Sequence, residues 1–228
     1  SPFAWCMTIA NFNGTPYVAV KYTGVSPQRR YVYSRESGSW GLLGTPPAPG
    51  NSAGSFQRAK LFADPANLNT VILLCNLQIV SVIGVGITRS VDGGANWDAF
   101  TTVFTPTSFL GAGNAGLWDI IQTPGSTPVL RGVAAYSTSG TSISLMEIEV
   151  LDPFSAAPTV NLSTIVAYGA IMDVRWVSVV VDGATGDLQL AMGGAVQMTG
   201  ASLLTVQAAA GGAAGRLALD AASLRVDG

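Results

Sequence analysis

The chain has 228 residues, of which 48% are hydrophobic and only 11% charged, and its formal net charge is −2. Soluble globular domains carry about 25% charged residues, so this composition excludes a disordered chain and provides no basic surface for nucleic acid or anionic lipid. The chain contains no histidine, which excludes Ser-His-Asp and Cys-His catalysis and any imidazole metal site.

The predicted elements repeat along the chain. Four similar segments begin at Trp5, Leu61, Trp118 and Trp176, about 57 residues apart. Self-similarity at a fixed period is the sequence signature of a repeat architecture. Each segment opens with an apolar strand, turns through Gly, Pro, Asn or Asp, and continues with three more short strands. In chain order the predicted strands are WCMTIAN, YVAVKY, YVYS, SWGLLG; LFAD, TVILLCN, GITRS, NWDAFTTV; WDIIQT, VLRGVAAY, SISLMEIEV, TVNLSTI; and WVSVVVD, LQLAMGG, LLTVQ, RLALDA.

Four strands per repeat of this length match the blade of a β-propeller. The sequence therefore predicts one all-β domain over residues 1–228, a propeller of about four four-stranded blades at approximately 1–54, 55–114, 115–171 and 172–228. The chain begins on an innermost strand and ends on an outermost one, residues 216–224. No strand is then left to clasp the ring, so either the blades close by side-chain packing or the chain is part of a larger ring or assembly.

A motif in the second repeat resembles a known family. Ser90-Val91-Asp92-Gly93-Gly94-Ala95-Asn96-Trp97 is similar to the Asp-box, or bacterial neuraminidase repeat, of sialidase-like propellers. A degenerate copy in the first repeat keeps Ser34, Glu36, Gly38 and Trp40 but is one residue shorter. We expect Asp92 to accept backbone N–H groups, Gly94 to adopt a positive φ and Trp97 to tuck beneath the turn. The resemblance implies a structural role for both copies, since the family carries these turns away from the binding face.

The tryptophan and cysteine residues of the predicted strands favour packing over binding. Trp5, Trp118 and Trp176 occupy equivalent positions of innermost strands, which favours core packing between blades over a sugar-stacking platform. Cys6 and Cys75 lie in apolar strands, where a small buried hydrophobe is favoured over a disulfide bridge.

Candidate binding residues follow from the loops that propellers use for ligands. By this resemblance the binding rim carries Arg29, Arg30, Arg58, Asp119, Asp173 and Arg175, with an ordinary polar rim as the alternative. Sialidase-like catalysis is disfavoured because the chain lacks the family's Arg-Ile-Pro motif. Glu147 and Glu149 have the spacing of a glycosidase pair, but the solvated face of an outer strand also explains them.

The sequence thus predicts a recognition or adhesion module, not an enzyme, that binds a glycan or protein on a cell or virion surface. The alternatives are a structural subunit of a multi-chain assembly, with copies of itself as partners, and a sialidase-like glycoside hydrolase. We expect no cofactor, no metal, no nucleic acid and no membrane insertion. Two sequons, at Asn13 and Asn161, matter only if the source adds N-glycans.

Overall fold

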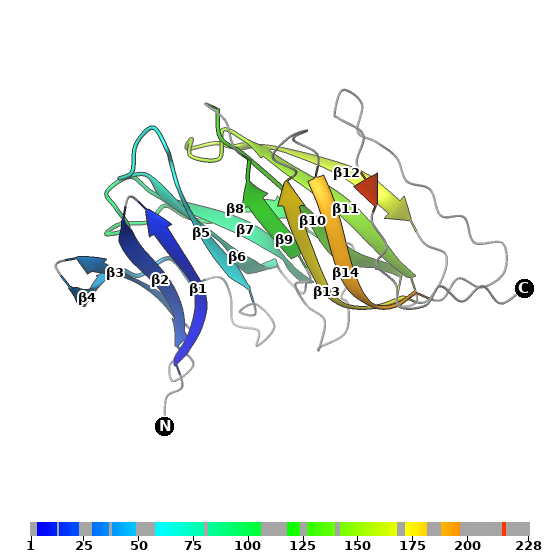
Figure 1. Ribbon diagram of the computed structural model, residues 1–228, viewed down its shortest axis with the longest axis horizontal. Coiled ribbons are helices and arrows are strands. Elements are labelled where there is room, and N and C mark those ends of the chain that lie inside the picture. Colours follow the sequence, from blue (N-terminus) through cyan, green and yellow to red (C-terminus); the bar gives the residue numbers. More distant parts are fainter. Residues whose placement is uncertain are drawn as a thin grey trace, which may run out of the picture. The chain divides into compact units, whose positions relative to one another are not determined.

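The computed structural model describes residues 4–12, 14–22, 29–36, 38–48, 58–79, 82–105, 118–123, 127–139, 142–167, 172–181, 188–196 and 216–217. Over these residues the protein is all-β, built of strands and turns (Figure 1). A helix long and apolar enough to cross a membrane is not found among them. The chain divides into two compact units, Ser1–Thr105 with Asp152–Thr159, and Pro106–Leu151 with Val160–Gly228, and each is described by itself.

The first unit contains two antiparallel sheets, each made of four consecutive strands. The strands of the first sheet, in spatial order, are β1 (Ala4–Phe12), β2 (Thr15–Tyr22), β3 (Arg29–Glu36) and β4 (Ser39–Gly44). Those of the second sheet are β5 (Ala59–Ala63), β6 (Val71–Ile79), β7 (Val82–Ser90) and β8 (Thr101–Phe104). The strands of these two sheets follow the order predicted from the sequence. Strand β8 is shorter than expected because residues 97–100 are not in a strand.

The second unit contains a third four-stranded antiparallel sheet and the described part of a fourth sheet. The third is made of β9 (Trp118–Gln122), β10 (Val129–Ser139), β11 (Ser142–Leu151) and β12 (Thr159–Ala167). The fourth contains β13 (Met172–Val181), β14 (Leu188–Val196) and β15 (Arg216–Leu217).

The end of the chain differs from the expected blade. The predicted third strand of the last repeat, residues 203–207, lies outside the described residues. Instead of following an antiparallel neighbour, β15 pairs directly with β14, and the pairing is parallel, with Arg216 opposite Gln189. The described strands nearest the two chain ends, β1 and β15, belong to different sheets.

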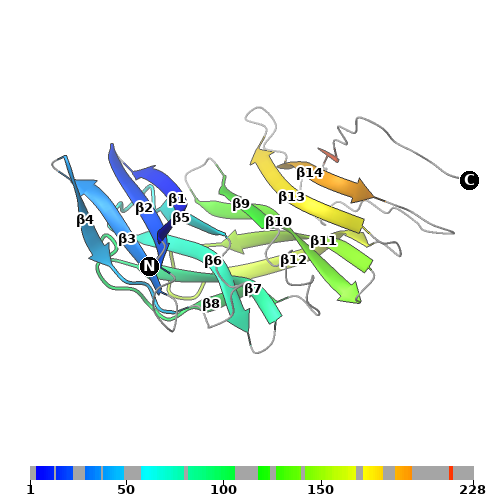
Figure 2. The ribbon, with the colours of Figure 1, turned by 90° about the horizontal axis from the view of Figure 1, so that it is seen from below.

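The first sheet is buried on one face only. Along β2 the side chains alternate, Tyr17 and Ala19 being buried and Val18 and Val20 partly exposed. The buried side chains pack on β5, which lies beside β1 and β2 (Figure 2). The resulting core cluster contains Tyr17, Ala19, Val32, Ala59, Leu61, Leu73 and Cys75. The alternating pattern of β2 is typical of a strand with one solvated face.

In the second sheet, strand β6 is buried on both faces. Residues 71–75 of β6 are all at most 1% exposed, although their side chains point alternately to opposite faces. The uninterrupted apolar run Val-Ile-Leu-Leu-Cys is typical of a strand buried on both sides. The two sheets of the first unit therefore differ: β6 of the second sheet is buried on both faces, whereas β2 of the first sheet is buried on one face only.

The third and fourth sheets lie against each other within the second unit, where β13 is beside β9 and β10. Trp118 of β9 is 1% exposed, as expected for core packing, whereas the side chains of Trp5 and Trp176 lie outside the described residues. The backbones of β9 and β10 approach closely at Gly132, where a Cβ atom would collide with the carbonyl oxygen of Asp119 and with Ile120. Glycine is therefore required at position 132 for this packing.

Candidate functional site

Residues 90–97, which we call the box turn, connect β7 to β8 and form a closed hydrogen-bond network. The carboxylate of Asp92 accepts three bonds, from Ser90 Oγ at 2.7 Å, the Asn96 backbone N–H at 2.8 Å and Asn96 Nδ2 at 2.6 Å. Ser90 Oγ accepts a bond from the Gly94 N–H at 2.8 Å. Gly93 and Gly94 have φ angles of 73° and 103°, which glycine adopts without a steric penalty. The backbone bond to Asp92 and the positive φ of Gly94 are those that the sequence predicts.

The same bonds perturb the carboxylate of Asp92. Backbone and side-chain hydrogen bonds from Asn96, followed by the bond from Ser90, lower the pKa of Asp92 from 3.8 to about 2. Hydrogen bonds to the charged form favour that form. All three partners lie within four residues of Asp92, so the shift is explained by the turn itself and does not require a ligand.

Trp97 attaches the box turn to the core of the first unit. Its indole Nε1 donates to the Gly94 carbonyl at 2.8 Å, and its ring packs against the core cluster between the first and second sheets. The Gly93 N–H donates to the Asn69 carbonyl at 2.7 Å, which joins the box turn to the turn between β5 and β6. The box turn thus connects several parts of one unit, as a folding device would.

The degenerate copy in the first sheet does not have this geometry. Gly38 has a φ of 86° in the turn between β3 and β4, and Ser34 is 3% exposed, but Trp40 is 51% exposed. We expected Trp40 to correspond to Trp97, and this is wrong. The shorter turn pairs Glu36 with Ser39, so Trp40 already lies in β4, on the face that points away from the core cluster. The side chain of Glu36 lies outside the described residues.

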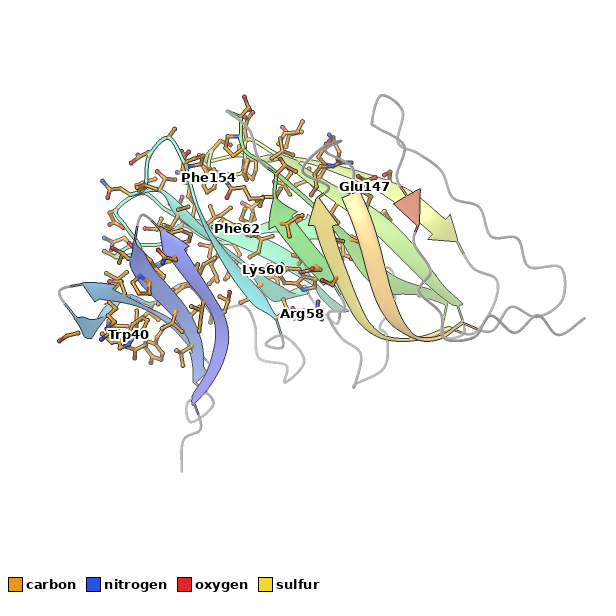
Figure 3. The ribbon with its side chains drawn as sticks, in the orientation of Figure 1. Trp40, Arg58, Lys60, Phe62, Glu147 and Phe154 are labelled. Carbon is orange, nitrogen blue, oxygen red and sulfur yellow. The ribbon has the colours of Figure 1, made fainter. Side chains whose placement is uncertain are left out.

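The predicted binding rim is only partly described. The side chains of Arg29, Arg30, Asp173 and Arg175 lie outside the described residues, and only their strand positions, on β3 and β13, are known. Arg58 precedes β5, is partly buried, and alternates with the core residues of that strand (Figure 3). The rim stays a prediction.

Asp119, the remaining rim residue, points into the second unit. It is 8% exposed, and its Oδ2 accepts a hydrogen bond from the Val179 N–H at 2.8 Å. This bond links β9 to β13 and satisfies a buried backbone donor. Such a position suits a structural role better than ligand binding.

Glu147 and Glu149 are not simply solvated, contrary to our expectation. They lie on β11, and Arg131 of β10 is opposite Glu149 in the sheet. Arg131 Nη2 contacts Glu147 Oε1 at 2.6 Å, and Arg131 Nε lies 3.9 Å from Glu149 Oε1. The exposed fractions of the Arg131 and Glu147 side chains are only 19% and 15%.

Two polar residues of β12 also contact these glutamates. Ser163 Oγ donates to Glu147 Oε2 at 3.4 Å, and Asn161 Nδ2 donates to Glu149 Oε2 at 3.0 Å. Cross-strand pairs of opposite charge stabilise sheets. Both carboxylates are therefore engaged by groups of the same sheet, an arrangement that a spacing argument along β11 alone does not reveal.

A small cavity in the first unit lies beside the ion pair of Arg89 and Asp98, whose Nε and Oδ2 atoms are 2.9 Å apart. Its volume is about 20 Å³, and its lining includes Ser155, whose buried Oγ has no hydrogen-bond partner. A cavity of this size holds one water molecule, whereas pockets for organic ligands have volumes of roughly 300–1,000 Å³. The cavity is therefore not a ligand site.

The most exposed apolar surface of the first unit is the outward face of the first sheet, which we call the open face. Four residues form a row across all four strands: Ile9 is opposite Val18, Val18 is opposite Tyr33, and Tyr33 is opposite Leu42. At the two edges of the sheet Ile9 is 71% and Leu42 is 54% exposed. Val18 and Tyr33, between them, are partly exposed.

Trp40 extends the open face along β4, since it is two residues from Leu42 and side chains at i and i+2 share a face. Figure 3 shows it on this outer strand. The charged residue opposite Trp40 is Arg35, whose Nε donates to the Gly38 carbonyl at 3.1 Å. This surface was not predicted from the sequence. Residues 17–20 of β2 are Tyr, Val, Ala and Val, so hydrophobicity alone does not distinguish the covered face of this strand from the exposed one.

No protein-family model matches the chain, and no curated protein matches it either.

Proposed function

We propose that this protein is a non-catalytic interaction module that acts through protein contacts made by the open face. The observation that carries this proposal is the row of Ile9, Val18, Tyr33 and Leu42 with Trp40 beside it, of which Ile9, Leu42 and Trp40 are each more than half exposed. Contiguous exposed apolar patches on soluble proteins mark interaction surfaces. The described open face is also poor in charge, as the centres of protein interfaces are.

We propose further that the four sheets are blades of a β-propeller, closed within one chain or completed by others. Three antiparallel sheets of four consecutive strands support this architecture, as does the face-to-face packing of consecutive sheets within each unit. The resemblance of the box turn to the Asp-box and the charge-poor composition support a cell-surface or virion-surface setting.

A non-catalytic role is supported by the polar groups of the third sheet. Glycoside hydrolysis needs one carboxyl group as an acid and another as a nucleophile or base. Glu147 and Glu149 are the closest pair of glutamates, and each contacts neighbouring side chains through its carboxylate oxygens. The chain also has no histidine to substitute for them.

A protein partner is favoured over a glycan by the chemistry of the open face. Sugars present hydroxyl groups at close intervals, and their recognition requires donors and acceptors beside any aromatic platform. Along the cross-strand row only Tyr33 carries a polar side-chain atom. Aromatic and aliphatic side chains without charge are what a protein interface buries at its centre.

Two measurements test this proposal. Purified protein should not turn over a panel of fluorogenic glycosides that includes sialosides. A photoreactive benzophenone side chain introduced in place of Leu42, in the cells that produce the protein, should give a cross-linked protein adduct. The same group in place of Leu162, which is 46% exposed on β12, should not.

Either of two outcomes would overturn the proposal. One is glycoside turnover that is lost in Glu147→Gln. The other is a failure of position 42 to cross-link to any protein under conditions in which the photoreactive group is shown to be active.

A further inference from the structure

Among the described residues of the first unit, the open face is an exposed apolar sheet face, and we infer that a second copy of this chain covers it. On this inference two copies associate through their open faces, sheet against sheet, around a two-fold axis. The inference rests on the proposed function and names the partner of its interaction surface.

The chain itself shows how such a face is covered. On the opposite side of the same sheet, Tyr17, Ala19 and Val32 are buried. They pack against Ala59 and Leu61, which belong to the second sheet of the first unit. Twisted sheets pack face to face in this way at a spacing of about 10 Å. The open face has the same kinds of side chain on the same twisted scaffold, so the surface that fits it is another apolar sheet face.

Charge argues against most other kinds of partner. Nucleic acids and acidic proteins are recognised through basic side chains, and the cross-strand row of the open face has none. The nearby Arg35 lies opposite Trp40 and is bonded to the hairpin turn. The cross-strand row carries no charge that would repel an identical row. An isologous pair of open faces is therefore electrostatically permitted, and two-fold symmetry closes it without further copies.

The size of the open face is sufficient for a reversible dimer. Its strands have 9, 8, 8 and 6 residues. With strands about 4.8 Å apart and about 3.3 Å of rise per residue, the sheet presents roughly 400–500 Å². Two such faces bury roughly 1,000 Å², close to the lower limit for a specific interface. We therefore expect a dimer whose population depends on protein concentration.

Sedimentation velocity over about two decades of concentration tests this inference, because a weak dimer dissociates on dilution. Wild-type protein should shift from the 23.4 kDa monomer towards twice that mass. Leu42→Asp and Ile9→Asp each place a carboxylate within the interface, one at each edge of the apolar row. Each should raise the dissociation constant by at least about 30-fold, the effect of losing one hot-spot residue.

Two control variants carry the same change elsewhere. Val91→Asp alters the box turn, where Val91 is 58% exposed, and Leu162→Asp alters β12, where Leu162 is 46% exposed. Both should dimerise as the wild type does. Far-UV circular dichroism of all four variants should match the wild type, since every substituted side chain is more than two-fifths exposed.

Each remaining outcome overturns the inference in a recognisable way. A monomer at every concentration excludes the second copy. If position 42 still cross-links to a different protein, the proposed function stands and only the partner is wrong. A dimer that is insensitive to Leu42→Asp uses another surface. A dimer that is sensitive to Leu42→Asp but not to Ile9→Asp pairs through the β4 edge, because Ile9 lies on the opposite edge of the sheet.

Discussion

Removing the indole ring of Trp97 should destabilise the first unit by about 3 kcal/mol. Truncation of a buried tryptophan to alanine typically costs about 3–5 kcal/mol, and Trp97 is only partly buried, which places it at the lower end. The figure includes roughly 1 kcal/mol for the bond from Nε1 to the Gly94 carbonyl. Trp40→Ala is the matched control: it removes the same ring at a 51% exposed position and should cost less than about 1 kcal/mol.

Hydrogen exchange measured by mass spectrometry localises the effect. The backbone amides of residues 71–75 lie in β6, which contributes Leu73 and Cys75 to the core cluster against which Trp97 packs. Their exchange rates report the stability of this region. A loss of about 3 kcal/mol should accelerate their exchange roughly 100-fold in Trp97→Ala, and Trp40→Ala should leave it nearly unchanged. Equal rates in Trp97→Ala and wild type would refute the reasoning, as would an equal acceleration by Trp40→Ala.

Three further predictions concern the turn and the second unit. Because the folded pKa of Asp92 is about 2 and its ordinary value is 3.8, its charged form stabilises the fold fully above about pH 4. The difference in melting temperature between wild type and Asp92→Asn should stay constant from pH 5 to 7 and shrink between about pH 4 and 2; a difference that is unchanged at pH 2 would contradict this. Gly132→Ala should lower the free energy of unfolding, measured by chemical denaturation, by about 1–3 kcal/mol because the added Cβ meets backbone atoms. The control Gly41→Ala, at a position with open space around it, should lower it by less than about 1 kcal/mol. Equal effects of the two substitutions would exclude the close approach at Gly132. Asp119→Ala should cost about 1–3 kcal/mol because the buried Val179 N–H loses its acceptor, and Asp119→Asn, which keeps an acceptor oxygen, should recover most of this loss in the same assay.

The sequence by itself determined the features that depend on residues close together in the chain. The box turn forms because Ser90, Asp92 and Asn96 bond within four residues of one another and glycines supply the positive φ angles. The order and spacing of the strands in the first three repeats follow from short apolar runs separated by turn-forming residues. The uninterrupted apolar run of β6 also indicates a strand that is buried on both faces.

Only the tertiary structure decided which apolar residues are buried and which polar residues meet. Trp40 and Trp97 have similar local motifs, but one is exposed and the other packs between two sheets, because a single missing residue moves Trp40 to the opposite face of β4. Arg131 meets Glu147, 16 residues further along the chain, and Glu149 through the pairing register of β10 and β11. The open face exists because β5 covers only the opposite face of the first sheet. Burial depends on what packs against a strand, and that partner comes from a distant part of the chain.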